Sequence, residues 1–394
     1  MTCMERSEIK RNLTGLELRV GTRLPWSVYS PQGTLLLTEG ALIRSEKQIE
    51  RLINIKAHYF QIPAIGVYTS SSAPKHVNTD RVSTFVIIHT LLERLEECFN
   101  LFLQNNDGDR FIRRTLQLVL DIQGVCEEQA DGVLGTMQLI VEAPHGLVHP
   151  LHAALMCEVA CRRMGKGSLE RLPVVAAALT HDLGMYEIQQ ELFEQSSPLT
   201  ERQRRIIDRH PQRSWELLKQ RGVTDKQWLK PVLQHHERLD GSGYPAGLVG
   251  DAICSEARLL AITDCYSAMI RPRAYRNQVP PRDALREIFQ QRGSTIDAEL
   301  ARLFIDIMGI FSPGTLVQLT HGELALVTGR GERHGQPPMV LLSNRLGERL
   351  EQPDPFILQD SADIKGIARI QDHAELLAML GQVWAPMTPV PSAQ

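Results

Sequence analysis

Apolar residues recur along the chain in two different patterns, and the changes between them divide it into segments. Short apolar runs separated by turn residues occur near the start, in LELRVGTRLPWSVYSPQGTLLLTEG, and again after Phe311, in TLVQL, LALVTG, PMVLLSN and PFILQ. Runs of this kind predict short β-strands. Between them, apolar residues recur at steps of three and four almost throughout, which predicts helices. The chain is therefore predicted to be mainly α, with a small strand-containing domain on each side of a helical bundle.

Residues 1–68 are expected to form a small N-terminal α/β accessory domain. Besides the strand-like runs, this segment contains SEKQIERLI, in which Ser45 and Gln48 form the capping-box pattern of a helix start. A strand-like AHYFQI follows. The segment carries no ligand signature, so a structural role is favoured for it.

Residues 69–138 are expected to contain a linker, TSSSAPKHVNTD, and then a pair of helices. The first helix carries a heptad-like apolar stripe, made of Phe85, Ile88, Leu92, Leu95, Phe99 and Phe102. The second carries Ile112, Leu116, Val119, Ile122 and Cys126. Such stripes fit an antiparallel hairpin within one chain, and they fit the seam of a homodimer equally well. The sequence leaves both arrangements open.

Residues 139–311 are predicted to form the helical bundle, and residues 312–394 a small β-rich C-terminal domain. The bundle segments are HPLHAALMCEVACRRMG, LPVVAAALTHDLGMYEI, a helix around Arg202 to Arg221, PVLQHHERL, SEARLLAITDCYSAMI and DALREIFQQ. The C-terminal domain ends in a short helix, DHAELLAML, and a proline-containing tail that is expected to be disordered.

Composition narrows the class of protein. The chain has 394 residues and a net charge of −3, which argues against bulk nucleic-acid binding. Its start, MTCMERSEIKRNL, lacks an apolar signal core, and no apolar run approaches membrane-spanning length. The 7 cysteines are scattered and odd in number, which is typical of reduced thiols. These features predict a soluble, cytoplasmic protein without a membrane span.

The candidate chemistry is concentrated in HHERLDGSGYPAGL, residues His235 to Leu248. Two adjacent histidines end a helix-compatible segment, and the glycines and proline after them make the backbone bend. Imidazoles beside a rigid loop suit a metal site with a substrate wall next to it. A histidine pair alone is weak support, because most histidines are solvated or satisfied by hydrogen bonds.

Other residues strengthen this interpretation. His181 and Asp182 follow the apolar run VVAAALT and therefore lie near the end of a buried helix, and His210 precedes a proline. Asp264 stands inside the apolar run LLAITDCYSAM. A buried acid is costly unless a cation or hydrogen bonds compensate it. Together with the His235–His236 loop, these residues form a coherent candidate metal site.

In this order, HD at 181–182, HP at 210–211, HHERLDGSGYPAGL at 235–248 and the Asp in AITDCYSAM resemble the HD-GYP family, part of the HD superfamily of metal-dependent phosphohydrolases. The resemblance covers residues 139 to 310. It implies a helical HD-type bundle that hydrolyses cyclic di-GMP to a linear dinucleotide or to GMP. The flanking segments look like accessory domains found beside such modules, although this part of the likeness is looser.

The resemblance implies a site for two divalent transition-metal ions, typically iron or manganese. The implied ligands are His149, His181, Asp182, His210, His235, His236 and Asp264. Asp182 would bridge the two ions. His152 is the rival of His149 for the first ligand position, and His145 stands where certain relatives have a glutamate for a third metal.

The resemblance also implies roles in the reaction. A hydroxide held between the ions would attack phosphorus, with His181, Asp182 and Arg273 at the catalytic centre. An arginine of the segment RPRAYR would hold the second phosphate or a guanine edge. The implied substrate-binding residues are Gly243, Tyr244, Pro245, Arg273 and Arg276. Glu237 is expected to orient a histidine rather than to bind a metal.

Three positions depart from the family pattern. The lysine of HD-x-x-K is Met185, the second acid of D-x-x-D-A-L is Ser267, and the glycine after H-P-x-x is Ser214. None of these changes removes an implied ligand. Met185 removes a cation expected near the scissile phosphate, at a cost of about 2–4 kcal/mol of transition-state stabilisation if nothing replaces it.

Three functions remain open at this stage. The leading one is a metal-dependent cyclic di-GMP phosphodiesterase, weakened to some degree by Met185. The alternative is a metal-containing receptor or scaffold that binds cyclic di-GMP, or a diguanylate cyclase domain, through the GYP loop. Met185 favours this alternative, and the complete ligand set opposes it. A third hypothesis, an HD phosphohydrolase acting on another nucleotide, is opposed by the GYP block.

Overall fold

The computed structural model divides the chain into two compact units, Met1–Val77 and Asn78–Gln394. Helices make up most of the second unit, and an antiparallel sheet lies near its C-terminal end. This arrangement confirms the prediction of a mainly α protein with strand-containing segments on both sides. The structure describes residues 9–12, 18, 20, 28–29, 35–37, 43, 45–54, 58–61, 83–104, 107–140, 143–271, 278–331, 336–358 and 360–384.

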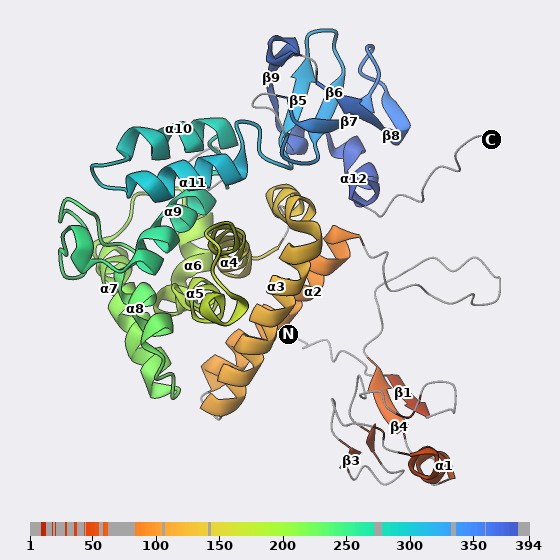
Figure 1. The fold of residues 1–394 in the computed structure, drawn as a ribbon, viewed down its shortest axis with the longest axis vertical. Helices are drawn as coiled ribbons and strands as arrows, with labels where there is room; N and C mark the ends of the chain where they lie inside the picture. The colour runs from red at the N-terminus through yellow and green to blue at the C-terminus, as the bar shows by residue number, and fades with distance from the viewer. Residues whose placement is uncertain are drawn as a thin grey trace. The chain divides into compact units, whose positions relative to one another are not determined.

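The described residues of the first unit form a four-stranded antiparallel sheet and one helix (Figure 1). Its elements are β1 (Ile9–Asn12), β2 (Val28–Tyr29), β3 (Leu35–Leu37), α1 (Glu46–Asn54) and β4 (His58–Gln61), with strand order β1-β4-β2-β3. The helix in SEKQIERLI and the strand in AHYFQI are confirmed. Strand β1 was not predicted, because IKRN is too polar to show an alternating pattern. The predicted linker lies outside the described residues.

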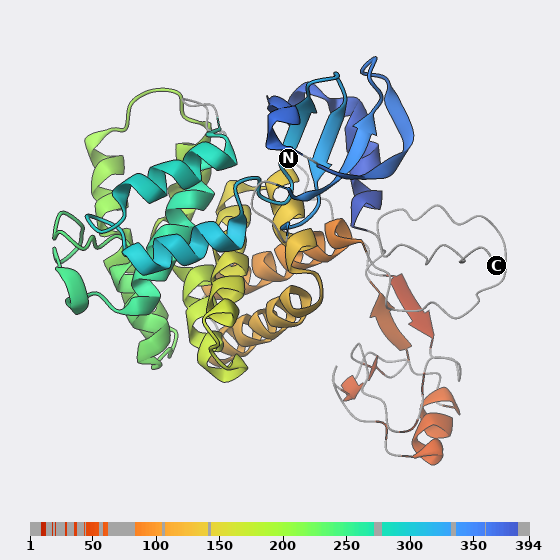
Figure 2. The same cartoon turned by 45° about the horizontal axis from the view of Figure 1, so that its top comes forward.

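Helices α2 (Thr84–Gln104) and α3 (Gly108–Leu139) lie side by side and antiparallel (Figures 1 and 2). Contacts at the start and in the middle of α2 fix this register, because the hydroxyls of Thr84 and Thr136 lie 2.6 Å apart and Arg94 pairs with Asp121. Most of the apolar stripe of α2 is buried. The intrachain hairpin is therefore the arrangement that the structure contains.

The bundle is built around α4 (His145–Arg163), in which every residue from 145 to 161 is buried. A helix buried on all sides belongs to the interior of a bundle, and α4 contacts α3, α5 and α9. The other helices are α5 (Ser168–Thr180), α6 (Tyr186–Glu194), α7 (Glu201–Gln220), α8 (Lys226–Gln234), α9 (Ser255–Met269), α10 (Pro281–Gln291) and α11 (Ala298–Met308). The histidines at positions 149, 181 and 235 therefore lie in the buried interior of the bundle.

The C-terminal sheet has five antiparallel strands in the order β8-β7-β6-β5-β9. The elements are β5 (Leu316–Leu319), β6 (Leu324–Val327), β7 (Pro338–Ser343), β8 (Arg349–Ile357), β9 (Ile364–Ala368) and α12 (Leu377–Val383). Alternate residues of β5 and β6 face two separate apolar clusters, one of which includes residues of α12. The first four strands were predicted, and β9 was not. The predicted tail, from residue 385 onward, lies outside the described residues.

The end of α3 packs directly against the C-terminal sheet. A methyl group at Gly135 would lie 2.4 Å from the Trp384 ring and 3.1 Å from the Gly314 nitrogen, so only glycine fits there. Helix α9 is held at the same junction. Arg271, which follows this helix, donates to the Ile140 carbonyl at 3.2 Å.

The hydroxyls of Tyr266 and Ser312 lie 3.2 Å apart in the buried interior. Tyr266 belongs to α9, and Ser312 lies in the connection between α11 and β5. Two residues before Tyr266, α9 carries Asp264, one of the predicted ligands. The junction with the sheet therefore helps to position a residue of the candidate site.

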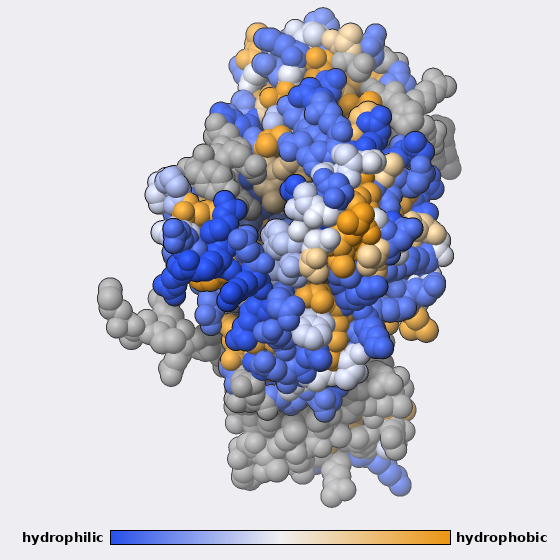
Figure 3. Space-filling view, turned by 90° about the vertical axis from the view of Figure 1, so that its left-hand side faces the viewer, coloured by the Kyte–Doolittle hydropathy of each residue, from blue (hydrophilic) through white to orange (hydrophobic). Residues whose placement is uncertain are grey.

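Figure 3 shows one face, on which hydrophilic side chains predominate and apolar ones form smaller groups. Among the described residues, no helix combines the length and the apolar character needed to cross a bilayer.

Candidate metal centre

The predicted ligands converge in the bundle although they come from five different helices. His149 lies on α4, and His210 and Asp264 lie on α7 and α9. The other four stand directly after helix ends: His181 and Asp182 follow α5, and His235 and His236 follow α8. Potential ligand atoms fall into two groups, each with its atoms within 4.8 Å of one another: His210, His235 and His236, and His149, His181 and Asp182.

The two aspartates connect these groups. One oxygen of Asp182 lies 3.2 Å from His210 Nε2, and the other lies 3.6 Å from His149 Nε2. Asp264 lies 2.9 Å from His149 Nε2 and 3.9 Å from His236 Nδ1. Each carboxylate therefore faces both groups, as a residue shared between two cations would.

Three of the histidines are oriented in the same way. The Nδ1 atoms of His181, His210 and His235 lie 2.8, 2.6 and 2.7 Å from the carbonyl oxygen three residues earlier. A carbonyl only accepts, so each Nδ1 carries the proton and each Nε2 presents a lone pair. Histidines that bind metals through Nε2 show this same pattern.

Two observations concern the Nε2 atoms that these rings direct into the site. His181 Nε2 is buried without a hydrogen-bond partner in the described part of the chain. His210 Nε2 and His235 Nε2 lie 3.0 Å apart, so two lone pairs face each other. A cation placed between them would turn this repulsion into coordination. The donor set of imidazole nitrogens and carboxylate oxygens therefore fits divalent transition metals.

The charges of the site lead to the same conclusion. Burial by itself would raise the pKa of Asp182 and of Asp264, but the surrounding histidines outweigh it and hold the pKa of both well below the usual range. Burial would lower the pKa of His181, but Asp182 and Asp264 raise it to about 9. Without a metal ion, a proton on His181 would balance these buried carboxylates. The site requires positive charge in its interior.

Two of the departures from the family pattern have a structural role. Ser267 Oγ lies 3.1 Å from His149 Nδ1 and so orients the ring that faces Asp264. Ser214 Oγ donates to the His181 carbonyl at 2.6 Å and accepts from the Gly184 nitrogen at 2.8 Å, which ties the HD turn to α7. Neither serine is a merely neutral replacement.

Gln189 is a site residue that the sequence did not reveal. Its side-chain nitrogen donates to Asp182 at 2.7 Å, and the residue is only 4 % exposed. Gln189 follows Asp182 by seven residues, about two helical turns, and this spacing is the sequence signal that could have linked the two residues. The turn between them made this spacing uninformative, because α6 begins only at Tyr186.

The GYP loop is held by Glu237, whose role differs from the predicted one. Its two carboxylate oxygens accept from the nitrogens of Ala246 and Leu248 at 2.7 and 2.9 Å. None of the hydrogen bonds found among the described residues joins Glu237 to a histidine, so the expected orienting role is wrong. The carboxylate instead fixes the loop that follows the histidine pair.

Gly243 and Tyr244 bring this loop against the histidines. A methyl group at Gly243 would lie 2.5 Å from the His236 carbonyl oxygen, so a larger residue would push the loop away. The Tyr244 nitrogen donates to the same carbonyl at 3.1 Å. Its ring stacks on His236 with the centroids 4.7 Å apart. The loop thus places an aromatic wall beside the candidate ligands; Pro245, joined to Tyr244 by a cis peptide bond, continues it.

A cavity of about 180 Å³ opens onto the site. Its polar lining includes His149, Asp182, His236 and Asp264, and its wall includes Met185 and Tyr244. We call this cavity the site cavity. His145 also lies in its wall.

His145 and His152, the other two histidines of α4, have different surroundings. His145 stacks against both His149 and Phe193, with centroids 5.3 and 4.7 Å apart. His152 is fully buried and does not line the site cavity, so His149 is the histidine that faces the candidate ligands. Arg273 and Arg276 lie outside the described residues.

Comparisons with known proteins agree with this geometry. Residues 136–300 match the HD domain family. The chain is 32% identical over 160 residues to "Cyclic di-GMP phosphodiesterase PA4108" of Pseudomonas aeruginosa, covering 41% of this chain and 38% of that protein. It is 30% identical over 212 residues to "Cyclic di-GMP phosphodiesterase response regulator RpfG" of Xanthomonas campestris, covering 51% and 54%.

A further relative carries a different substrate in its name. The chain is 26% identical over 182 residues to "3'3'-cGAMP-specific phosphodiesterase 3" of Vibrio cholerae, covering 46% of this chain and 39% of that protein. The chain spans about half of the length of these relatives or less. The similarity is therefore concentrated in the segment that contains the metal-ligand candidates.

Proposed function

Residues 136–300 form an HD domain of the HD-GYP type, and on this basis we propose that the protein is a metal-dependent phosphodiesterase that hydrolyses cyclic di-GMP. The observation that carries the proposal is the set of buried imidazoles at positions 181, 210 and 235, whose Nε2 lone pairs point at one another and at ionised carboxylates. Two of the relatives described above are named for this activity.

The proposed centre holds two divalent ions, with iron or manganese as the proposed metals. The proposed ligands are His149, His181, Asp182, His210, His235, His236 and Asp264. When bound, the ions supply Lewis acidity, which lowers the pKa of water toward about 7 and offsets the charge of the phosphodiester. Asp182 is the proposed shared ligand because its two oxygens face different histidines, His210 and His149.

The chain's own residues contribute orientation and shape. Hydrogen bonds from Nδ1 to backbone carbonyls hold three imidazole rings with Nε2 directed inward. Gln189 holds Asp182 from the cavity side. Tyr244 stacks on His236 and forms a wall against which a guanine can lie. These groups fix their positions before substrate arrives, so little reorganisation is required during the reaction.

The proposal extends to the rest of the chain. We assign residues 1–68 and 312–394 as accessory domains, 69–138 as linker and hairpin, and 139–311 as the catalytic domain. A bacterial second messenger as substrate implies a cytoplasmic setting, and none of the cysteines among the described residues forms a disulfide.

The second candidate function is a metal-containing receptor or scaffold that binds the dinucleotide, or a diguanylate cyclase domain, through the GYP loop. One observation favours it: the side chain at position 185, which lines the site cavity, is an uncharged methionine. The two functions separate in one experiment on anaerobically purified protein of known metal content. Conversion of cyclic di-GMP to a linear product supports the enzyme, and stoichiometric binding without product supports the receptor.

Replacing Tyr244 tests the substrate wall. Tyr244→Ala is expected to weaken cyclic di-GMP binding about tenfold, since an aromatic face contributes about 1–3 kcal/mol per stacked base. Tyr244→Phe keeps the ring and should retain most of the affinity. Equilibrium binding and metal analysis on both variants provide the measurement. Unchanged affinity and turnover in Tyr244→Ala, at equal metal content, would return the residue to a structural role in the turn.

A further inference from the structure

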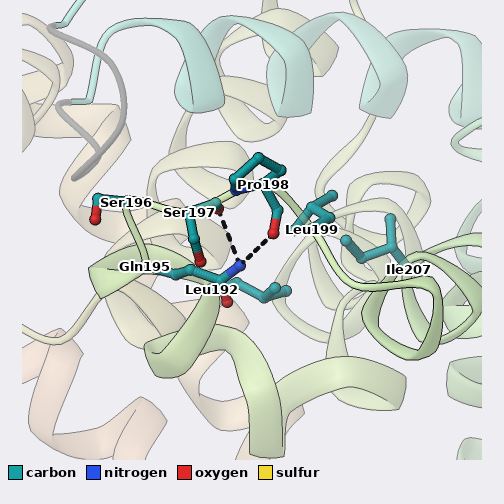
Figure 4. Close-up of a pocket in the computed structure, with 7 residues that line it drawn as sticks. All are labelled: Leu192, Gln195, Ser196, Ser197, Pro198, Leu199 and Ile207. Atoms are coloured by element: carbon teal, nitrogen blue, oxygen red, sulfur yellow. Dashed lines mark hydrogen bonds between the residues drawn. The ribbon is translucent and has the colours of Figure 1, made fainter.

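A second cavity, of about 390 Å³, adjoins the site cavity. Leu192 on α6 and Ile207 on α7 line both of them. The rest of the second cavity is formed by the loop at residues 195–199 (Figure 4). We call it the loop cavity. Whatever binds at the candidate metal centre therefore has a larger, open space directly beside it.

The site cavity is too small for a whole cyclic dinucleotide. Sites for small organic ligands usually measure about 300–1,000 Å³, and the site cavity measures about 180 Å³. It has room for a phosphodiester and its sugar but leaves the bases to be placed elsewhere. The loop cavity is of the right size for a base, and its apolar wall, which includes Leu192, Leu199 and Ile207, suits the faces of an aromatic ring.

The loop cavity is also pre-formed. The Gln195 side-chain nitrogen donates to the carbonyls of Ser197 and Pro198 at 3.0 and 2.9 Å (Figure 4). The Gln195 side-chain oxygen accepts from Gln203 at 2.6 Å, and the Gln203 oxygen accepts from the Thr200 nitrogen at 2.9 Å. Buried Gln203 on α7 thus anchors the whole loop. Binding of a ligand therefore carries no additional entropic cost of ordering this segment.

These hydrogen bonds also determine which polar groups of the loop cavity remain available to a purine base. The Gln195 side-chain nitrogen donates twice within the loop, so this side chain has no donor left for a base edge. The remaining polar side chains of the lining are the hydroxyls of Ser196 and Ser197. A hydroxyl both donates and accepts, so it pairs with the O6 acceptor of guanine and with the N6 donor of adenine.

We propose that the loop cavity binds one purine base of the cyclic dinucleotide and that it accepts guanine and adenine alike. This inference rests on the proposed phosphodiester hydrolysis at the adjoining centre. Sites with fixed, buried hydrogen-bond partners discriminate by factors of about 10⁴ or more, whereas apolar sites discriminate by about 10–200. The loop cavity belongs to the second kind.

The test compares three phosphodiesters on the metal-loaded full chain: cyclic di-GMP, cyclic di-AMP, which must place adenine in the loop cavity, and the base-free bis(4-nitrophenyl) phosphate. For the unmodified protein, kcat/KM for the two cyclic dinucleotides should agree within about tenfold. Leu199→Trp fills the loop cavity from its rim. This variant should lower kcat/KM for both cyclic dinucleotides about tenfold, after correction for any change in kcat/KM for the base-free diester. It should also weaken the equilibrium binding of both dinucleotides by about the same factor.

Leu169→Trp is the matched control, because Leu169 is 78 % exposed and lies on α5 outside both cavities. It should leave all three substrates unaffected. The base-subsite proposal is overturned if Leu199→Trp does not lower cyclic dinucleotide binding, or if kcat/KM for the two dinucleotides differs by more than about tenfold.

Failure of the proposed function has a different signature. In that case the chain binds the cyclic dinucleotides, or hydrolyses the base-free diester, without converting either dinucleotide. The equilibrium binding of Leu199→Trp then still decides whether the loop cavity holds a base. If neither dinucleotide binds at all, both proposals are wrong.

Discussion

Asp182→Ala is expected to remove the metal ions and to lower kcat/KM for cyclic di-GMP by at least about 1,000-fold, which corresponds to about 4 kcal/mol. The reason is that each of its oxygens faces a different histidine, His210 on one side and His149 on the other. A carboxylate shared by two ions affects both when it is lost. It also supplies half of the buried negative charge that the two aspartates provide.

Metal analysis of anaerobically purified protein gives the direct measurement. The unmodified chain should contain about two transition-metal ions, and Asp182→Ala should lose both or retain one weakly. Asp306→Ala, which removes an exposed carboxylate on α11, is the control and should keep the full metal content. A full complement of metal in folded Asp182→Ala would show that the assignment of this residue is wrong.

Met185→Lys is expected to raise the rate of cyclic di-GMP hydrolysis about 30-fold, which corresponds to about 2 kcal/mol. Met185 lines the site cavity, where a thioether neither carries charge nor donates a hydrogen bond. A lysine there would stabilise the negative charge that develops on the phosphate. Met185 is half-buried and stands immediately before α6, and lysine is similar to it in length, so the packing cost should be small.

Single-turnover rates at equal metal content provide the comparison. Met185→Leu, which changes the shape of the side chain without adding charge, is the matched control and should not accelerate the reaction. A flat or reduced rate in Met185→Lys, with fold and metals intact, would mean that the charge of the phosphate is balanced by another group. Met185 would then be ordinary lining of the cavity.

Much of the site could be predicted because each candidate ligand belongs to a short local motif. His181 and Asp182 are adjacent, and so are His235 and His236; each pair stands at a helix end that the apolar pattern already indicated. Local patterns of this kind survive in a single sequence. The geometry that brings the pairs together was supplied by the resemblance to a known family.

The contacts that support the ligands could not be predicted. Ser267 meets His149 across 118 positions of the chain, and Ser214 meets the His181 carbonyl across 33. In the sequence both serines look like losses from a motif. Only packing shows that each has acquired a hydrogen bond of its own.

The loop cavity was hidden for a similar reason. Leu192 and Ile207 have the spacing of ordinary core residues on two amphipathic helices. A cavity arises only because the loop between these helices is held open by Gln195 and Gln203. Strands β1 and β9 were missed because they are short and depend on pairing with β4 and β5 for their stability.

The junction between α3, α9 and the C-terminal sheet limits how this protein can be rearranged in evolution or in the laboratory. Gly135 fits against Trp384 with no space for a methyl group, and Tyr266 shares a hydrogen bond with Ser312. A genetic cut after residue 311 would thus sever a bond two residues from Asp264. The C-terminal sheet is therefore not an independent module that another domain could simply replace. A sheet grafted from another protein would have to bring its own matching surface, and a shortened gene would yield a helical bundle with one face exposed.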